Sequence, residues 1–116
     1  MQITNAVNLI VELENNPDSL ISIVMKSLLK DDPLEELKPE LQTTTYKARI
    51  LSTIKIIDEV KIESFLTPLS LEASKVLTSP DLLIFEKLKK DVEIEMIEAR
   101  RRIKELARKI ENHDTL

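Results

Sequence analysis

The sequence predicts an all-α fold: an antiparallel bundle of four to five helices that ends in one long helix. The 116 residues contain no glycine, so the positive-φ turns that tight β-hairpins need are costly. Proline follows a short polar residue at four places, a pattern typical of helix starts. Apolar residues recur every three or four positions, as on one face of a helix.

The four start signals are Asn16-Pro17, Asp32-Pro33, Thr67-Pro68 and Ser79-Pro80. The polar side chain can accept an N–H of the first turn, and proline at the first helical position loses no hydrogen bond. From these signals and the apolar spacing we expect five helices, over residues 4–15, 17–30, 40–60, 68–77 and 80–112, with a short helix over 33–38 that leads into the third. Part of 50–65 is rich in β-branched residues and could instead be extended.

Length and composition favour a single helical domain over residues 1–116. Apolar residues make up 42% of the chain, which suits one folded core. We divide the domain into a short-helix part, 1–79, and a long C-terminal helix, 80–112. The abundance of Ile, Leu, Lys and Glu resembles proteins of thermophiles, including those of archaea.

The long C-terminal helix carries a stripe of apolar residues at steps of three and four, which is partly coiled-coil-like. The stripe could lie along the chain's own bundle, or its distal part, 96–110, could project and pair with a second copy or another helical protein. Both can hold, with the proximal half inside and the distal half outside. The predicted partner interface consists of Met96, Ala99, Ile103, Leu106 and Ile110.

Charge is divided unevenly along the chain. Residues 1–42 hold three basic and eight acidic residues, a net of −5, whereas 99–109 hold six basic residues and only Glu105 as an acid. The basic side chains could contact nucleic-acid phosphates, dock on an acidic partner, or keep the helix solvated. They are Arg100, Arg101, Arg102, Lys104, Arg108 and Lys109.

Several classes of chemistry lack the residues they need. The chain has no cysteine and one histidine, His113, which leaves no thiol site, no histidine-based triad and no E-x-x-H pair for a di-iron centre. Phosphate-binding loops and nucleophile elbows need glycine. We therefore nominate no catalytic, cofactor-binding or metal residue and expect no small-molecule ligand.

These observations favour a non-enzymatic interaction or assembly protein that self-associates, most simply as a homodimer, or docks a helical partner. The alternative is a nucleic-acid-binding accessory or regulatory protein that uses the basic 99–109 segment. The chain has no apolar run that could span a membrane and no recognisable secretory signal. We therefore expect a cytoplasmic protein.

Overall fold

The computed structural model describes residues 2–61 and 63–113, and this part of the chain is all-helical, as predicted. It holds six α-helices and one short 3-10 helix and contains no strand. The elements are α1 (Thr4–Glu14), α2 (Leu20–Ser27), α3 (Pro33–Leu37), η1 (Lys38–Leu41), α4 (Thr44–Glu59), α5 (Glu63–Val76) and α6 (Ser79–Glu111).

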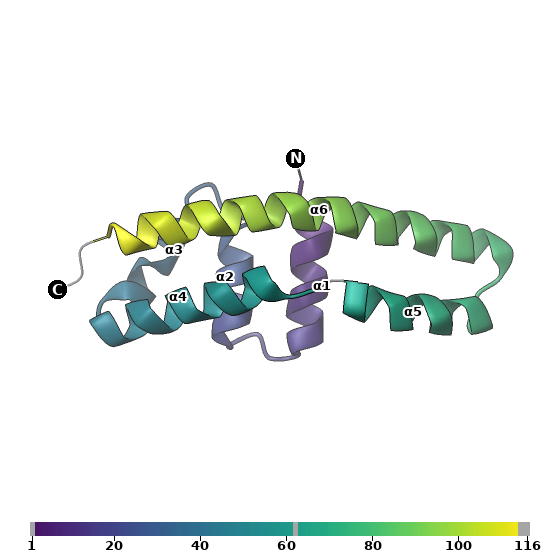
Figure 1. Ribbon diagram of the computed structural model, residues 1–116, viewed down its shortest axis with the longest axis horizontal. Coiled ribbons are helices and arrows are strands. Elements are labelled where there is room, and N and C mark those ends of the chain that lie inside the picture. The colour runs from purple at the N-terminus through teal and green to yellow at the C-terminus, as the bar shows by residue number, and fades with distance from the viewer. Residues whose placement is uncertain (1, 62, 114–116) are drawn as a thin grey trace.

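The helices form an elongated molecule with extents of 56 × 25 × 19 Å. Figure 1 shows α4 and α5 one after the other along α6, while α1 and α2 run across them. After α5 the chain turns back, so that α6 returns beside α5 in the opposite direction. The crossing of α1 and α2 departs from the antiparallel bundle that we expected.

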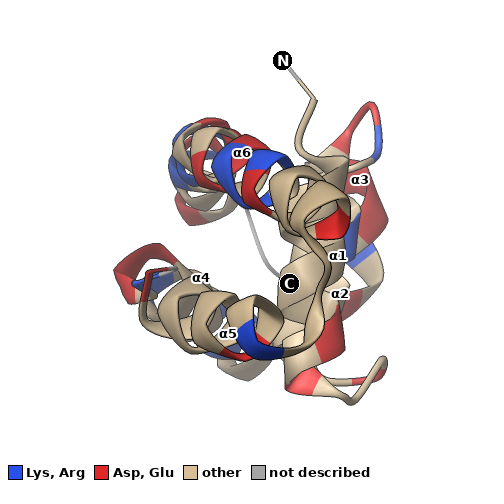
Figure 2. Ribbon diagram, turned by 90° about the vertical axis from the view of Figure 1, so that its right-hand side faces the viewer, with Lys and Arg blue, Asp and Glu red and all other residues tan. Residues whose placement is uncertain are grey.

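The hydrophobic core lies in one half of this elongated shape. α1, α3 and α4 pack on the second half of α6, and α2 packs on α1, α3 and α4. The largest fully buried side chains come from these elements, from η1 and from the residue before α1: Ile3, Met25, Leu37, Leu41, Ile50, Met96, Ile103 and Ile110. The opposite half contains α5 and the first turns of α6. Figure 2, which looks at the molecule from that end, shows α1 and α2 on one side of the layer formed by α4, α5 and α6.

The Pro-containing start signals have three different outcomes. Asp32 caps α3 by accepting a hydrogen bond from the Glu35 N–H at 3.2 Å, and α6 starts at Ser79 with Pro80 in its first turn. Asn16-Pro17 forms a turn, and Ser19 caps α2 three residues later. The prediction is wrong at Thr67, because Pro68 lies inside α5.

The two ends of α1 are secured without glycine. At its C-terminus Asn15 adopts the left-handed conformation, with φ of 56°, that glycine usually supplies. At its N-terminus no neighbouring side chain caps the helix. Instead the Asn5 N–H donates to the Glu95 carboxylate of α6 at 2.9 Å, and Glu95 is buried. This contact fixes where α1 stands on α6.

The β-branched stretch is helical rather than extended over most of its length. α4 continues to Glu59, with Ile50, Thr53, Ile54 and Ile57 on its buried face. The spacing of those four residues buries one helical stripe, and burial outweighs the weak strand preference of isoleucine and threonine. Val60 is extended, α5 begins at Glu63, and residue 62 lies outside the described residues.

Candidate functional site

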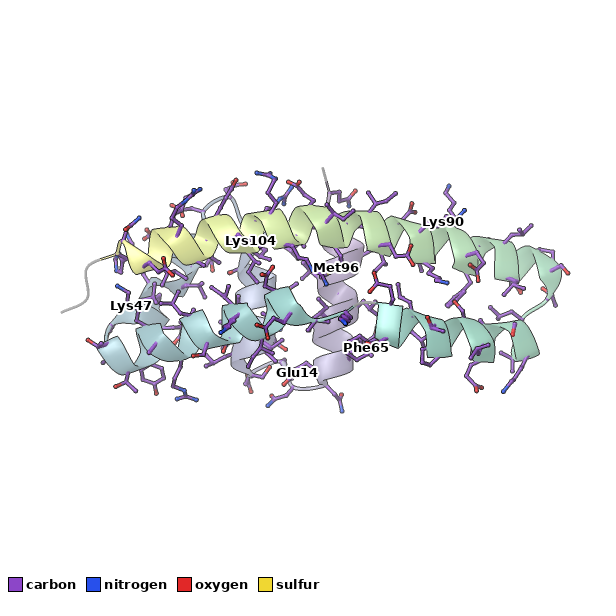
Figure 3. The ribbon with its side chains drawn as sticks, viewed as in Figure 1. Glu14, Lys47, Phe65, Lys90, Met96 and Lys104 are labelled. Carbon is purple, nitrogen blue, oxygen red and sulfur yellow. The ribbon has the colours of Figure 1, made fainter. Side chains whose placement is uncertain are left out.

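The predicted partner interface on α6 is buried within the protomer's own core. Met96, Ala99, Ile103, Leu106 and Ile110 are each at most 3% exposed. α1, α3 and α4 cover this part of α6, and Figure 3 places Met96 where α6 crosses α1. The expected projection of 96–110 is therefore wrong for the folded single chain. Sequence periodicity identified the buried stripe correctly but could not tell which chain covers it.

The exposed apolar surface lies at the other end of α6. Within the part of the chain that the structure describes, α5 packs on α6 and on no other helix. Leu66 and Ala73 of α5 are buried in this contact, and Phe85 of α6 is half-buried. A two-helix hairpin leaves both of its broad sides open, and a pair of helices alone has little core.

One side of this hairpin is lined by large apolar side chains, which we call the hairpin face. Its members are between 40% and 76% exposed: Phe65, Leu69 and Val76 of α5, and Ile84 and Leu88 of α6. On α5, Leu66 and Ser70 face α6, and Phe65 and Leu69 each stand one position before them in the sequence. In the same way, Ile84 and Leu88 each stand one position before a residue of α6 that faces α5. Because α5 and α6 run in opposite directions, residues that stand one position before a contact residue lie on the same broad side of the hairpin in both helices.

The hairpin face looks toward the same side as α1. On α6 the residues Ile84, Leu88, Asp91 and Glu95 follow one another at steps of four, three and four, and so form one strip of the helix. Glu95 at the end of that strip bonds to Asn5 of α1. One side of the long α4–α5/α6 layer is therefore covered by α1 over one half and left open over the other (Figure 2).

The opposite side of the hairpin is mostly polar. The residues that immediately follow inward positions include Thr67 and Ser74 on α5 and Glu86 on α6. Lys90 points away from α5 in Figure 3. Two exposed leucines, Leu71 and Leu83, also lie on this side. This side of the hairpin thus mixes polar side chains with two exposed leucines, whereas the hairpin face carries five large apolar side chains.

The basic segment of α6 is largely engaged with groups of the same chain. Arg101 donates to the carboxylates of Glu98 and Glu105, the latter at 2.6 Å, and Arg102 donates to Glu98 at 3.2 Å. Arg100 donates to the Val60 carbonyl at the end of α4. The Lys104 Nζ atom lies 4.0 Å from Asp58 Oδ1. Arg108 and Lys109 are exposed in the last turns of α6, where cations favour the helix dipole.

These pairings affect the titration of Glu98. The hydrogen bond from Arg101, aided by Arg102, lowers the pKa of the Glu98 carboxyl to about 2, against an ordinary value of 4.5. Arg101 responds in the opposite direction, because its bond to Glu98 raises the pKa of the guanidinium. The segment therefore acts first as an internal ion-pair network along the surface of α6.

The described residues contain neither a cluster of metal ligands nor a helix that could span a membrane. No three His, Cys, Asp or Glu side chains among residues 2–61 and 63–113 are grouped so that they could hold a metal ion. His113 lies at the end of α6, and its carbonyl accepts a hydrogen bond from Lys47 Nζ at 2.7 Å. None of the described helices combines the length and the apolar character needed to cross a membrane.

The sequence contains a signal for the hairpin face that lies outside the helix predicted over 68–77. Starting a helix at Pro68 excluded Phe65, although Phe65, Leu69 and Val76 share one side of a helix that begins earlier. Ile84 lies beside the main stripe of α6 rather than on it. Comparison with known proteins adds no further guide, since no family model, curated protein or solved structure matches this chain.

Proposed function

We propose that this protein is a non-enzymatic helical interaction or assembly protein that docks a partner through the hairpin face. The observation that carries the proposal is a set of five large apolar side chains, each at least 40% exposed, on a helix pair that no other described element covers. Apolar surface gathered on one side of an element marks a docking site more often than scattered exposed residues do. The docking surface thus belongs to the proximal part of α6 together with α5, and not to residues 96–110.

Energetics support a partner that covers the face. Full burial of a Leu, Ile or Phe side chain contributes about 1.5–3 kcal/mol. These five side chains are still largely exposed, so a partner that covers them would gain a large part of that free energy. The hairpin has little internal core of its own, because Leu66 and Ala73 are the only described residues of α5 buried between the helices. A partner therefore stabilises the hairpin as well as binding to it.

The absence of native cysteine allows a direct test. A thiol introduced by Ile84→Cys lies on the hairpin face, and one introduced by Leu71→Cys lies on the opposite side. We expect the thiol at position 84 to react with a maleimide much more slowly in an extract of cells that express the protein than in a dilute purified sample. The thiol at position 71 should react at a similar rate in both. Equal reactivity of position 84 in the two samples would contradict the proposal.

Nucleic-acid binding is the second candidate, and no contact favours it. Of the six basic residues, Arg100, Arg101 and Arg102 donate to groups of the same chain, and Lys104 lies beside Asp58. Phosphate binding must compete with these contacts. We expect a fluorescence titration with short DNA and RNA at low salt to show no salt-sensitive binding. Micromolar affinity that falls steeply with salt and is lost on charge reversal of residues 100–102 would revive this function.

A further inference from the structure

We infer that the occupant of the hairpin face is a basic amphipathic helix of a partner protein, which lies along both α5 and α6. The inference rests on the proposed function, because it names the chemistry of the partner for the same surface. Two features of the molecule support it: the sign of the charges that border the hairpin face, and the shape of the element that presents it.

The charged side chains on the same side as the hairpin face are all acidic. On α5, Glu72 stands one position before the buried Ala73, as the apolar members of the face stand before their own contact residues. On α6, Asp91 stands in the same relation to the buried Val92, and Asp81 lies in the first turn of the same strip. Three carboxylates therefore border the five apolar side chains.

The lysines of the hairpin lie off this side. Lys75 and Lys87 each stand one position before a residue of the hairpin face, on the outer edges of the two helices. Lys90 points away from α5 (Figure 3), and Lys89 stands one position after a face residue. The Lys75 Nζ atom lies 3.7 Å from Glu72 Oε1, but these side chains are 69% and 72% exposed. Such an exposed pair holds its members weakly, so it does not neutralise the acidic border.

The acidic border selects the chemistry of the occupant. Lysine or arginine side chains beside an apolar stripe complement it, whereas an acidic helix and the phosphates of nucleic acid or anionic lipid are repelled. An acid of the same strip already acts in this way inside the protomer. Glu95, one turn beyond Asp91, accepts a hydrogen bond from the N–H of Asn5 in α1 at 2.9 Å.

The shape of the hairpin favours a helix as the bound element. The backbone groups of α5 and α6 bond within their own helices, so no open edge is available for a partner strand. The 14 residues of α5 extend for about 20 Å, which a partner helix of about four turns matches. Its apolar residues, spaced three and four apart, contact both α5 and α6. We expect reversible binding in the micromolar range, because so short an interface buries less area than a permanent complex.

A synthetic peptide of about 18 residues serves as the probe. It carries leucines at steps of three and four, lysines on both flanks and a fluorescent label, and the full chain is titrated into it while fluorescence anisotropy is recorded. One control peptide has glutamate in place of every lysine, and a second has the same composition in scrambled order. We expect only the basic amphipathic peptide to bind, with an affinity that falls as salt rises.

Variants of the protein locate the bound peptide. Asp91→Lys on α6 and Glu72→Lys on α5 should each weaken binding at least about tenfold, whereas Glu86→Lys makes the same change of charge on the opposite side and should change affinity by at most about twofold. Leu88→Ser should likewise weaken binding far more than Leu71→Ser, although these leucines are 47% and 60% exposed. Circular dichroism verifies that each variant remains helical.

Absence of binding at about 1 mM protein, or equal binding of a control peptide, would overturn the inference. Equal losses in the two charge-reversed sides would do so too, because the peptide would then respond only to the net charge of the chain. If the inference fails while the thiol at position 84 remains protected in extract, the proposed function survives with a partner of different chemistry. Loss of that protection as well removes the proposed function.

Discussion

Two parts of α6 both carry apolar side chains, and the other described helices cover them to different degrees. Over residues 92–110 the stripe is buried by α1, α3 and α4. Over residues 79–91, α5 is the one described element that lies against the helix, and Ile84 and Leu88 remain exposed. The difference teaches that the covering elements, and not the stripe itself, decide whether an apolar helix face becomes core or interface.

The first way to test this contrast is to truncate one isoleucine in each environment. Ile103→Ala removes a 1%-exposed side chain from the core and should lower the free energy of unfolding by about 2–5 kcal/mol. Ile97→Ala, on the same helix but 73% exposed, should change it by at most about 0.5 kcal/mol. Urea unfolding followed by circular dichroism measures both values. Similar losses in the two variants would contradict the assignment of core and surface.

The second test concerns Pro68, which lies inside α5. Proline there lacks the N–H that would bond to the Ser64 carbonyl and crowds that carbonyl, so Pro68→Ala should stabilise α5 by about 1–3 kcal/mol. Because α5 packs only on α6 among the described elements, the gain should appear as slower hydrogen exchange in α5 and leave residues 92–110 unchanged. Unchanged exchange throughout α5 would show that Pro68 costs the helix nothing.

The third test addresses the contact that anchors α1 to the covered half. Glu95→Ala removes the acceptor for the Asn5 N–H and should destabilise the fold by about 1–2 kcal/mol. Hydrogen exchange at the first turn of α1 should become faster. Glu95→Gln keeps an oxygen acceptor, so we expect it to restore part of the loss. Equal stability of wild type and Glu95→Ala would mean that α1 is positioned by packing alone.

The smallest expected effect is a pH dependence from Glu98. Its pKa is lowered in the folded state to about 2, so its ion pairs stabilise the fold above the ordinary value of 4.5. That contribution is lost as the pH falls from 4.5 through about 2. Glu98→Gln should therefore be less stable than wild type near neutral pH, and the difference should shrink in acid. A difference that stays constant between pH 6.5 and pH 2.5, about two units on either side of 4.5, would exclude this linkage.

Sequence reasoning predicted the helical class because glycine is absent and apolar residues recur at helical spacing. It placed α6 within one residue at each end, since Pro80 and the long stripe both act locally. Other features depend on residues distant in sequence. Glu95 caps α1 from 90 positions away, and the burial of Ile103 requires α1, α3 and α4 to be brought onto α6.

The same reason explains the errors in the candidate site. A stripe on one helix records that something covers it, but not whether the cover comes from the same chain. The Thr67-Pro68 signal misled in a different way, because α5 starts at Glu63 and tolerates proline in its second turn. The helix therefore includes Phe65, and with it one edge of the hairpin face.

Hydrogen exchange in dilute purified protein tests the central claim most directly, because it reports on both parts of α6 in one sample. We predict that amides of α5 and of residues 79–91 are weakly protected, while residues 92–110 are strongly protected. Protection in the hairpin that equals that of residues 92–110 would contradict the account.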